Sequence, residues 1–235
     1  MAIKGILFDK DGTLLDYEAT WMPVNWQAAL AVADGDPRLA GRLMVAGGYD
    51  AKRRAVKAGS ILAAGTVQEI AEAWAPHLPG ADGPALVALI DRVFERGAGG
   101  SAVQLTDLRG LFQRLRARGL ALGVATSDSL KGITATLGGF DVLDLLDFTA
   151  GYDSGHGVKP GPGMVRGFCA ALGLSPRAVA VVGDSYHDLE MGRRAGAGLR
   201  IAVLSGASAR GDLAPHADHV IDSVADLEAL LDRAA

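Results

Sequence analysis

The sequence has little of three features, and each shortage excludes a class of protein. Its single cysteine, Cys169, cannot form an internal disulfide, so the chain suits a reducing cytoplasm. Its 23 Lys and Arg against 27 Asp and Glu give a formal net charge of -4, which argues against a nucleic-acid partner. No uncharged stretch is long enough to span a bilayer, and charged residues interrupt the first apolar run. We therefore expect a cytoplasmic protein with small ligands and no membrane partner.

What the sequence does contain is enough apolar material for a large core. Of its 235 residues, 49% are hydrophobic and 21% are charged, a balance typical of a globular protein with one large domain or one and a half. Four apolar runs end in small or acidic residues, and their lengths and β-branched residues suit strands buried on both faces, as in a parallel sheet. The runs are residues 3–9, 120–128, 178–185 and 199–206.

Helical patterns separate these runs. In residues 106–119, Thr106 is a candidate N-cap, apolar residues recur at helical spacing, and Gly119 ends the pattern. The same character is found in residues 161–176, 187–196 and 224–235. Strand and helix alternate from about residue 106 onward. This alternation predicts a doubly wound α/β fold with a mostly parallel sheet.

The segment 17–98 differs from the rest because it has no comparable strand-like run. Alanine-rich helical stretches, broken by Gly and Pro, occupy about 24–34, 51–64, 67–76 and 84–96. We interpret 17–98 as a small helical domain inserted after the first strand, with 1–16 and 99–235 forming the other domain. The glycine-rich return junction, GAGGS at 97–101, is either a plain loop or a hinge.

The residues that carry chemistry follow the apolar runs. In open α/β sheets, ligands bind outside the carboxyl ends of the strands, where the chain order switches sides. The residues found there are Asp9, Asp11, Thr126, Ser127, Asp184 and Asp188, with Lys159 in a loop between the second and third runs. Acidic groups, a hydroxyl and a lysine can converge on a metal-bound phosphate, because Mg²⁺ takes hard oxygen ligands. The inventory therefore predicts phosphoryl transfer.

These residues stand in four motifs, which are DKDGTLLD at 9–16, VATSD at 124–128, VKP at 158–160 and GDSYHD at 183–188. Taken together, in this order and over almost the whole chain, they resemble the haloacid dehalogenase superfamily. The resemblance implies a Rossmann-like core. Because the insertion falls between the first and second motifs, it also implies a helical cap like that of phosphoglycolate phosphatases and beta-phosphoglucomutases.

The resemblance assigns a role to each motif. Asp9 would be the nucleophile that attacks phosphorus and becomes an aspartyl-phosphate. Asp11 would protonate the leaving oxygen and later take a proton from the attacking water. Thr126 would donate a hydrogen bond to the phosphoryl group, and Lys159 would neutralise charge on Asp9 and the phosphate.

The resemblance also implies a Mg²⁺ site, formed by the Asp9 carboxylate, the Asp11 carbonyl and Asp184. Asp188, one helical turn past Asp184, would contact the metal through water or support another ligand. The backbone N–H groups of Lys10, Asp11 and Ser127 would bind phosphoryl oxygens, and Gly12 would let the chain leave the strand sharply.

Lys10 departs from the commoner family pattern, in which many members carry an apolar residue at this position. By strand alternation, the Lys10 side chain is expected to point away from Asp9 and Asp11 and to have a structural role. Asp128, at the end of the second motif, is expected to cap the following helix rather than to take part in catalysis.

The predicted cap contains a basic cluster within residues 52–57. It is either a solvated helix face or a substrate site in which Arg53 or Lys57 meets an anion. Tyr17 and Trp21, just after the first motif, either line the entrance to the site or pack between core and cap.

The resemblance implies a Mg²⁺-dependent phosphatase that hydrolyses a small phosphorylated metabolite, and phosphoglycolate is the best candidate. A sugar phosphomutase of the beta-phosphoglucomutase type shares all these core residues and remains an alternative, as does a catalytically silent binding protein on the same fold. Dehalogenation is disfavoured because family dehalogenases lack the acid two residues after the nucleophile, which here is Asp11. The expected oligomeric state is a monomer or a homodimer.

Overall fold

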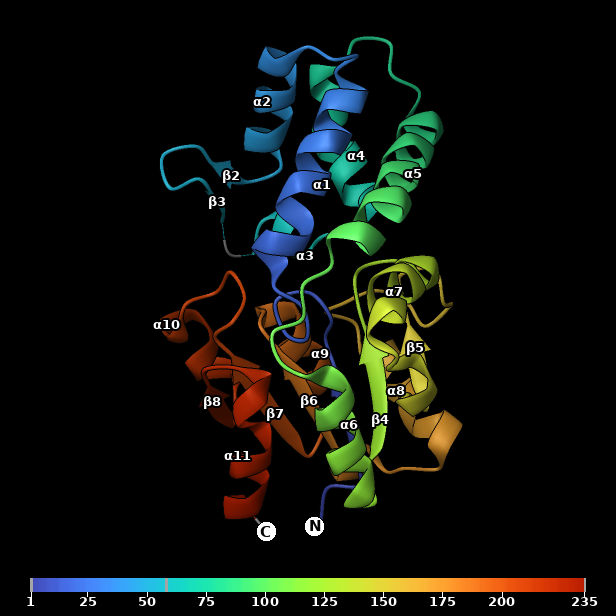
Figure 1. Ribbon diagram of the computed structural model, residues 1–235, viewed down its shortest axis with the longest axis vertical. Coiled ribbons are helices and arrows are strands. Elements are labelled where there is room, and N and C mark those ends of the chain that lie inside the picture. Colours follow the sequence, from blue (N-terminus) through green and yellow to red (C-terminus); the bar gives the residue numbers. More distant parts are fainter. Residues whose placement is uncertain (1, 58, 235) are drawn as a thin grey trace.

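The computed structural model describes residues 2–57 and 59–234. A six-stranded parallel sheet lies at the centre of its larger domain (Figure 1). The strand order is β5-β4-β1-β6-β7-β8, and every neighbouring pair is parallel. The strands are β1 (Gly5–Phe8), β4 (Ala121–Ala125), β5 (Phe148–Ala150), β6 (Val179–Gly183), β7 (Leu199–Val203) and β8 (His219–Ile221). All residues of β1 and β6 are buried, as predicted for strands covered on both faces.

Strand β1 lies between β4 and β6 in the middle of the sheet. The chain first fills one side of β1 with β4 and β5, and then crosses to the other side to form β6, β7 and β8. The winding direction therefore reverses at the carboxyl end of β1. This is the place where open α/β sheets bind their ligands.

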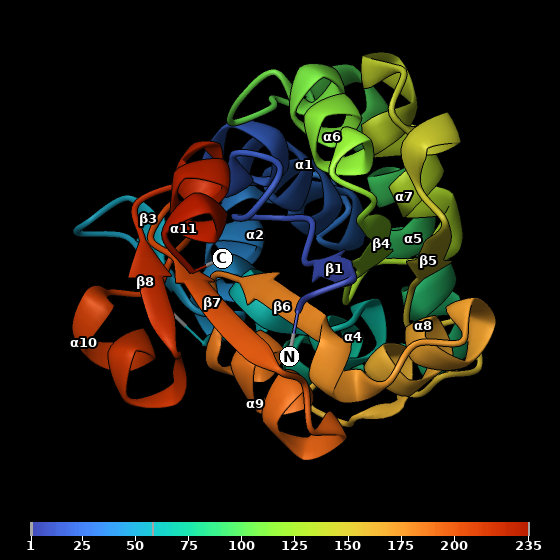
Figure 2. The ribbon, with the colours of Figure 1, turned by 90° about the horizontal axis from the view of Figure 1, so that it is seen from below.

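Helices cover both faces of the sheet, so the predicted doubly wound α/β fold is confirmed (Figure 2). One face packs against α6 (Leu108–Ala117), α7 (Leu130–Leu137) and α11 (Leu227–Ala234), and the other against α8 (Gly163–Leu172) and α9 (Tyr186–Ala195). The short α10 (Arg210–Leu213) lies between β7 and β8 in the chain. Across residues 2–57 and 59–234, no helix is both long and apolar enough to cross a membrane.

Five α-helices of the described residues form a cap beyond the carboxyl edge of the sheet (Figure 1). They are α1 (Tyr17–Val32), α2 (Pro37–Ala46), α3 (Ile61–Ala64), α4 (Val67–Trp74) and α5 (Gly83–Ser101). The cap has its own apolar core, in which Trp74 and Ile90 are completely buried. Asp16 caps α1 by accepting a hydrogen bond from the Ala19 N–H at 3.0 Å. Asp16 thus starts α1, the first helix of the cap, directly after the first motif.

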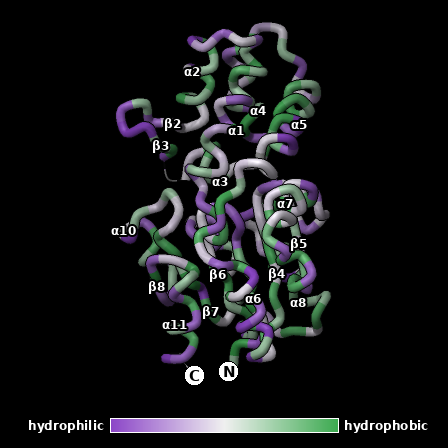
Figure 3. Tube along the Cα trace, viewed as in Figure 1, coloured by the Kyte–Doolittle hydropathy of each residue, from purple (hydrophilic) through white to green (hydrophobic). Residues whose placement is uncertain are grey.

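Residues 51–64 do not form the predicted helix. The chain forms a hairpin of β2 (Tyr49–Asp50) and β3 (Ala55–Val56). Only the last four residues of the segment 51–64, which form α3, are helical. Arg54 adopts a φ of 56°, and Gly48 just before the hairpin adopts 109°, conformations that a right-handed helix does not contain. The tip of the hairpin is strongly hydrophilic (Figure 3). The basic cluster therefore lies on a hairpin rather than on a helix face.

The glycine-rich junction at 97–101 is helical, so it is not a plain loop, and hinge motion at this junction stays a prediction. Helix α5 continues to the end of this junction, and the predicted domain boundary at 98/99 falls inside it. A Cβ on Gly97 would lie 2.8 Å from Val24 Cγ1, and one on Gly99 would lie 3.0 Å from the Ala135 carbonyl oxygen. The glycines thus allow α5 to pack closely against α1 and α7.

Candidate active site

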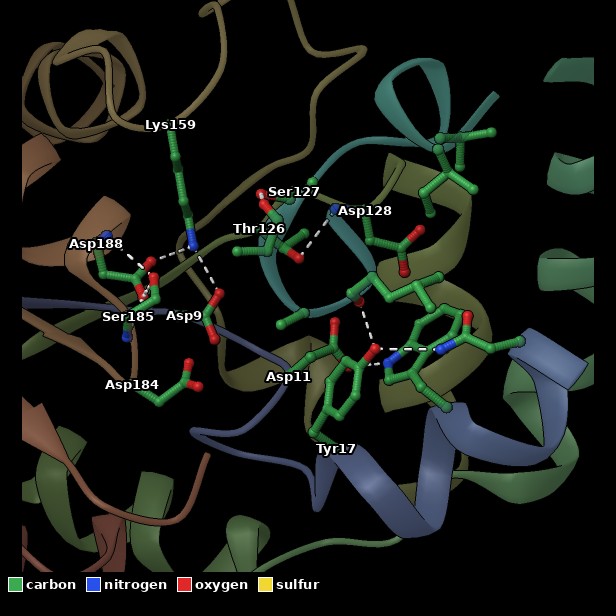
Figure 4. A pocket seen from close by; sticks show the side chains of 18 of the residues that line it. Asp9, Asp11, Tyr17, Thr126, Ser127, Asp128, Lys159, Asp184, Ser185 and Asp188 are labelled. Atoms are coloured by element: carbon green, nitrogen blue, oxygen red, sulfur yellow. Dashed lines mark hydrogen bonds and ion pairs between the residues drawn. The ribbon is translucent and has the colours of Figure 1, made fainter. Parts of the chain in front are cut away.

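The four predicted motifs meet at the carboxyl ends of β1, β4 and β6, beneath the cap (Figure 4). The residues that they bring to one cavity are Asp9, Asp11, Thr126, Ser127, Lys159, Asp184 and Asp188. The opposite wall of the cavity comes from α1, α3, α4, α5 and the α3–α4 loop. The cavity therefore lies between the switch point of the sheet and the cap.

Lys159 joins two carboxylates at the centre of the site. Its Nζ lies 2.6 Å from Asp9 Oδ1 and 2.5 Å from Asp188 Oδ1. The second Asp188 oxygen accepts hydrogen bonds from the Ser185 N–H and Oγ at 3.1 and 2.6 Å. Ser185 and Asp188 also form the capping box that begins α9. The start of α9 thus holds Asp188 so that it orients the lysine toward Asp9.

Asp9, Asp184 and Asp188 form a buried group of carboxylates whose ligand atoms lie within 4.8 Å of one another. Burial and the charges of Asp188 and Asp11 raise the pKa of Asp9 to about 7, although Lys159 opposes this shift. Burial and the charges of Asp9 and Asp188 also hold the pKa of Asp184 well above its usual value. Within the described residues, Asp9 Oδ2 is buried and has no hydrogen-bond partner. A divalent cation would relieve this excess of buried negative charge, so the donor set fits Mg²⁺.

Two glycines make room for the Asp184 side chain. A Cβ on Gly12, whose φ is +86°, would lie 2.6 Å from Asp184 Oδ2, and one on Gly206 would lie 1.7 Å from it. Ser205 Oγ donates a hydrogen bond to the Gly12 carbonyl at 2.7 Å. Ser205 and Gly206 are not among the predicted site residues, although they end the fourth apolar run. Their position after a strand next to β6 is the signal that would have found them.

The second motif supplies two hydroxyl groups with different partners. Thr126 is 2% exposed, and its Oγ1 accepts a hydrogen bond from the Asp128 N–H at 3.1 Å, which leaves its own proton for another acceptor. Ser127 Oγ donates to the Ala64 carbonyl at 3.0 Å. Ala64 ends α3, so Ser127 connects the core directly to the cap.

The Lys10 side chain does not point away from Asp11, so this prediction is wrong. Strand β1 ends at Phe8, and strand alternation therefore no longer governs residue 10. Lys10 is completely buried, and its Nζ lies 2.6 Å from Asp11 Oδ2, 3.1 Å from Asp128 Oδ2 and 4.9 Å from the centroid of the Trp21 ring. The two carboxylate contacts are ion pairs by distance without the angles of hydrogen bonds. Burial opposes the charged form of Lys10, but the Asp11 and Asp128 carboxylates raise its pKa.

Asp128 is not the N-cap of α7, contrary to the prediction. Ser129 has that position, and its Oγ accepts a hydrogen bond from the Gly132 N–H at 3.0 Å. The Asp128 carboxylate accepts from the Ser129 N–H at 2.7 Å and pairs with Lys10. The buried ammonium needs a counter-charge, and Asp128 provides it.

The cap wall of the cavity is neutral in the part of the chain that the structure describes. Its lining residues are Tyr17, Trp21, Asn25, Leu62, Ala63, Ala64, Gly65, Val67, Ile70 and Phe94. Asn25 Nδ2 donates to Tyr17 Oη at 3.1 Å, and Tyr17 Oη donates to the Leu62 carbonyl, so these polar groups already bind one another. Trp21 packs edge-on against Phe94 with ring centroids 5.1 Å apart. Tyr17 and Trp21 thus both line the cavity and pack within the cap.

Arg53 and Lys57 are exposed and do not belong to the residues that line the cavity. Their contact with a substrate anion stays a prediction. Outside the cavity, the cap meets the core through Tyr152 Oη, which lies 3.2 Å from Asp91 Oδ1. Lys131 Nζ makes a further contact, 3.4 Å from Glu95 Oε1. Both acidic partners belong to α5, so this helix seats the cap on the core.

A buried carboxylate beside a lysine, at the switch point of a capped α/β sheet, forms a site that can bind and neutralise an anionic group such as a phosphate ester. The family model of haloacid dehalogenase-like hydrolases matches residues 3–196. The chain belongs to this family, which confirms the resemblance found in the four motifs.

Known proteins agree with this assignment. The chain is 27% identical over 239 residues to the N-acetylmuramic acid 6-phosphate phosphatase of Pseudomonas aeruginosa, covering 100% of this chain and 97% of that protein. It is 31% identical over 90 residues to the phosphoglycolate phosphatase of Haemophilus influenzae, but the match spans only 38% of this chain and 40% of that protein. A crystal structure of a predicted phosphoglycolate phosphatase from Haemophilus somnus has the same fold, with a TM-score of 0.72, 21% identity and 97% coverage of each chain. The names of the two relatives and the family together support a phosphatase.

Proposed function

We propose that the protein is a Mg²⁺-dependent phosphomonoester hydrolase that works through an aspartyl-phosphate on Asp9. The observation that best supports this proposal is the state of the Asp9 carboxylate. One oxygen is fixed by Lys159, and the other is buried without a partner in the part of the chain that the structure describes. A carboxylate held in this way can attack an electrophile without help from a base.

The donor set would hold Mg²⁺ through the Asp9 and Asp184 carboxylates and the Asp11 carbonyl. Asp188, which is already bound by Lys159 and Ser185, would act through water or by orienting its neighbours. When bound, the ion would offset the negative charge that the phosphate brings to a site rich in carboxylates.

In the first step, an Asp9 oxygen attacks phosphorus and the bond from phosphorus to the leaving oxygen breaks. Asp11 gives its proton to that oxygen, which leaves as an alcohol. Thr126 Oγ and the backbone N–H groups of Lys10, Asp11 and Ser127 bind phosphoryl oxygens, while Lys159 neutralises their charge. In the second step, water attacks phosphorus, Asp11 takes its proton, and the bond to Asp9 breaks to release inorganic phosphate.

The substrate is proposed to be a small phosphorylated metabolite. Phosphoglycolate is the candidate from resemblance, and several relatives bear the name phosphoglycolate phosphatase. Its carboxylate would, however, face the neutral cap wall, and an unpaired buried charge costs several kcal/mol. Phosphoglycolate therefore requires Arg53 or Lys57 to reach the cavity, whereas an ester with a small neutral leaving group does not. For the same reason the cap wall favours hydrolysis over a mutase, which must hold a second phosphate.

The test is phosphate release from a panel of phosphorylated metabolites with and without Mg²⁺. We expect Mg²⁺-dependent turnover, and a loss on the order of 10⁴-fold or more in Asp9→Asn, because the nucleophile is removed. Asp16→Asn is the matched control, since asparagine also caps helices well. Mg²⁺-dependent release that survives Asp9→Asn would contradict the mechanism. Isomerised phosphosugar without free phosphate would favour the mutase.

A further inference from the structure

We propose that Lys10 is a positioning residue that, together with Trp21 of the cap, sets the orientation of the Asp11 carboxylate. The proposal rests on the proposed function, in which Asp11 exchanges a proton with the leaving group and with water. The Lys10 side chain then serves the reaction in addition to the structural role expected from the sequence.

The burial of Lys10 is the first observation. Its side chain is 0% exposed, although an ammonium loses much hydration free energy when it is buried and is normally retained inside a protein only when paired. Lys10 faces two carboxylates, which belong to Asp11 and Asp128. The Asp128 carboxylate alone balances the charge of the Lys10 ammonium. The contact between Lys10 and Asp11 is therefore not needed to neutralise that charge.

The second observation is that both oxygens of Asp11 are engaged. Oδ2 lies 2.6 Å from Lys10 Nζ, and Oδ1 accepts a hydrogen bond from Trp21 Nε1. The Asp11 side chain is still 16% exposed and lines the cavity. A side chain held at both oxygens cannot turn freely about its rotatable bonds, and each oxygen still has a second lone pair that can carry the exchanged proton. Proton transfer depends steeply on such alignment with the reacting oxygen.

The third observation links this arrangement to the cap. Trp21 belongs to α1, and its ring lies 4.9 Å from Lys10 Nζ while packing against Phe94 of α5. The hydrogen bond to Asp11 and the cation–π contact with Lys10 therefore depend on the same ring. A cap that lifts away from the core breaks both contacts. The orientation of Asp11 is thus complete only when the cap is seated.

A pair of substrates separates positioning of the acid from general damage. p-Nitrophenolate leaves without a proton, whereas the alkoxide of p-nitrobenzyl phosphate, which has nearly the same shape, needs one. If Asp11 is misplaced, the bond from phosphorus to the leaving oxygen breaks more slowly in the benzyl ester but at an unchanged rate in the phenyl ester. With the phenyl ester, only the second step, attack by water, becomes slower. Nitrophenolate is then released in a burst before steady turnover. Ethyl and trifluoroethyl phosphate provide the same contrast if the rings do not fit.

The first variant combines Lys10→Met with Asp128→Asn, so that the Lys10–Asp128 ion pair is removed without leaving a buried charge. The second variant is Trp21→Phe, which keeps an aromatic ring but loses the Nε1 donor. Trp26→Phe is the matched control, because Trp26 lies on the same helix and packs against Tyr49 without lining the cavity. Thermal unfolding identifies the folded variants, and Trp21→Phe tests the proposal even if the double variant does not fold.

We expect kcat/KM for the benzyl ester to fall roughly 10- to 100-fold in both variants, while kcat/KM for the phenyl ester changes less than about threefold. Trp26→Phe should affect the two esters equally. Equal losses on both esters in the variants, or no loss, would overturn the positioning role while leaving the proposed function intact. A wild-type protein inactive on every ester, or an active Asp9→Asn, would instead overturn the proposed function and this inference with it.

Discussion

The two walls of the cavity are built in opposite ways. The core wall comes from strand ends and loops of the sheet and carries five carboxylates and Lys159, whereas the described cap wall is neutral. The carboxylates are those of Asp9, Asp11, Asp128, Asp184 and Asp188. A charged wall suits a phosphate and a metal, and a neutral wall suits whatever the phosphate is attached to. Chemistry and substrate choice are thus divided between core and cap, and each of the following changes tests one side of that division.

Asp184→Asn should have the largest effect of these changes, because it removes a proposed Mg²⁺ ligand from the core wall. We expect turnover to fall on the order of 10³-fold and the rise in melting temperature on adding Mg²⁺ to disappear. Without metal, the variant should be more stable than the wild type at neutral pH, because it removes the burial penalty and the carboxylate repulsion that hold the pKa of Asp184 well above its usual value. Differential scanning fluorimetry with EDTA and with Mg²⁺ measures both effects. An unchanged response to Mg²⁺ would show that the metal binds elsewhere.

Gly206→Ala tests whether the backbone around Asp184 matters as much as its charge. The new Cβ would lie 1.7 Å from Asp184 Oδ2, so the carboxylate must move. A displacement of about 1 Å at a reacting centre costs on the order of 10²-fold in rate. Gly211→Ala is the matched control, because no atom lies within 4 Å of its added Cβ. Equal kcat values for the two variants would mean that Asp184 tolerates displacement.

The same division explains what the sequence could predict. Asp9, Thr126 and Asp184 each follow a buried apolar run, and parallel strands bring their carboxyl ends to one edge. These residues could therefore be placed together without knowledge of the cap. Strands β5 and β8 were missed because each is only three residues long and gives no extended apolar run.

The predictions that differ from the structure concern features that depend on contacts with distant parts of the chain. The glycines at 97–101 indicate flexibility when considered alone, but Val24 and Ala135 make them sites of close helix packing. The direction of the Lys10 side chain depends on Asp128 and on Trp21 in the cap, which no local pattern contains. The hairpin at 49–56 replaces a helix that local composition favoured, since tertiary context overrides propensity.

Ala63→Lys tests whether the neutral cap wall selects the substrate. Ala63 is a partly exposed lining residue on α3, so a long side chain can enter without burying its whole length. We expect kcat/KM for phosphoglycolate to rise about tenfold relative to 2-hydroxyethyl phosphate, because a carboxylate gains a nearby charge while the neutral ester does not. Ala63→Gln is the matched control for side-chain length. An unchanged ratio would place the leaving group away from α3.

Ser127→Ala should have the smallest effect, although Ser127 lies on the core wall. Its hydroxyl donates to the Ala64 carbonyl, so its removal weakens the seating of the cap by about 1 kcal/mol, while the backbone N–H proposed to bind phosphate remains. We expect a several-fold rise in KM with little change in kcat, and a similar effect from Tyr152→Phe, which loses a contact with Asp91 outside the cavity. Steady-state kinetics of both variants makes the comparison. A fall in kcat of about 100-fold in Ser127→Ala alone would show that the hydroxyl binds the reacting phosphate. The Ser127 side chain would then belong to the catalytic groups of the core wall, and its role would not be limited to the contact with the cap.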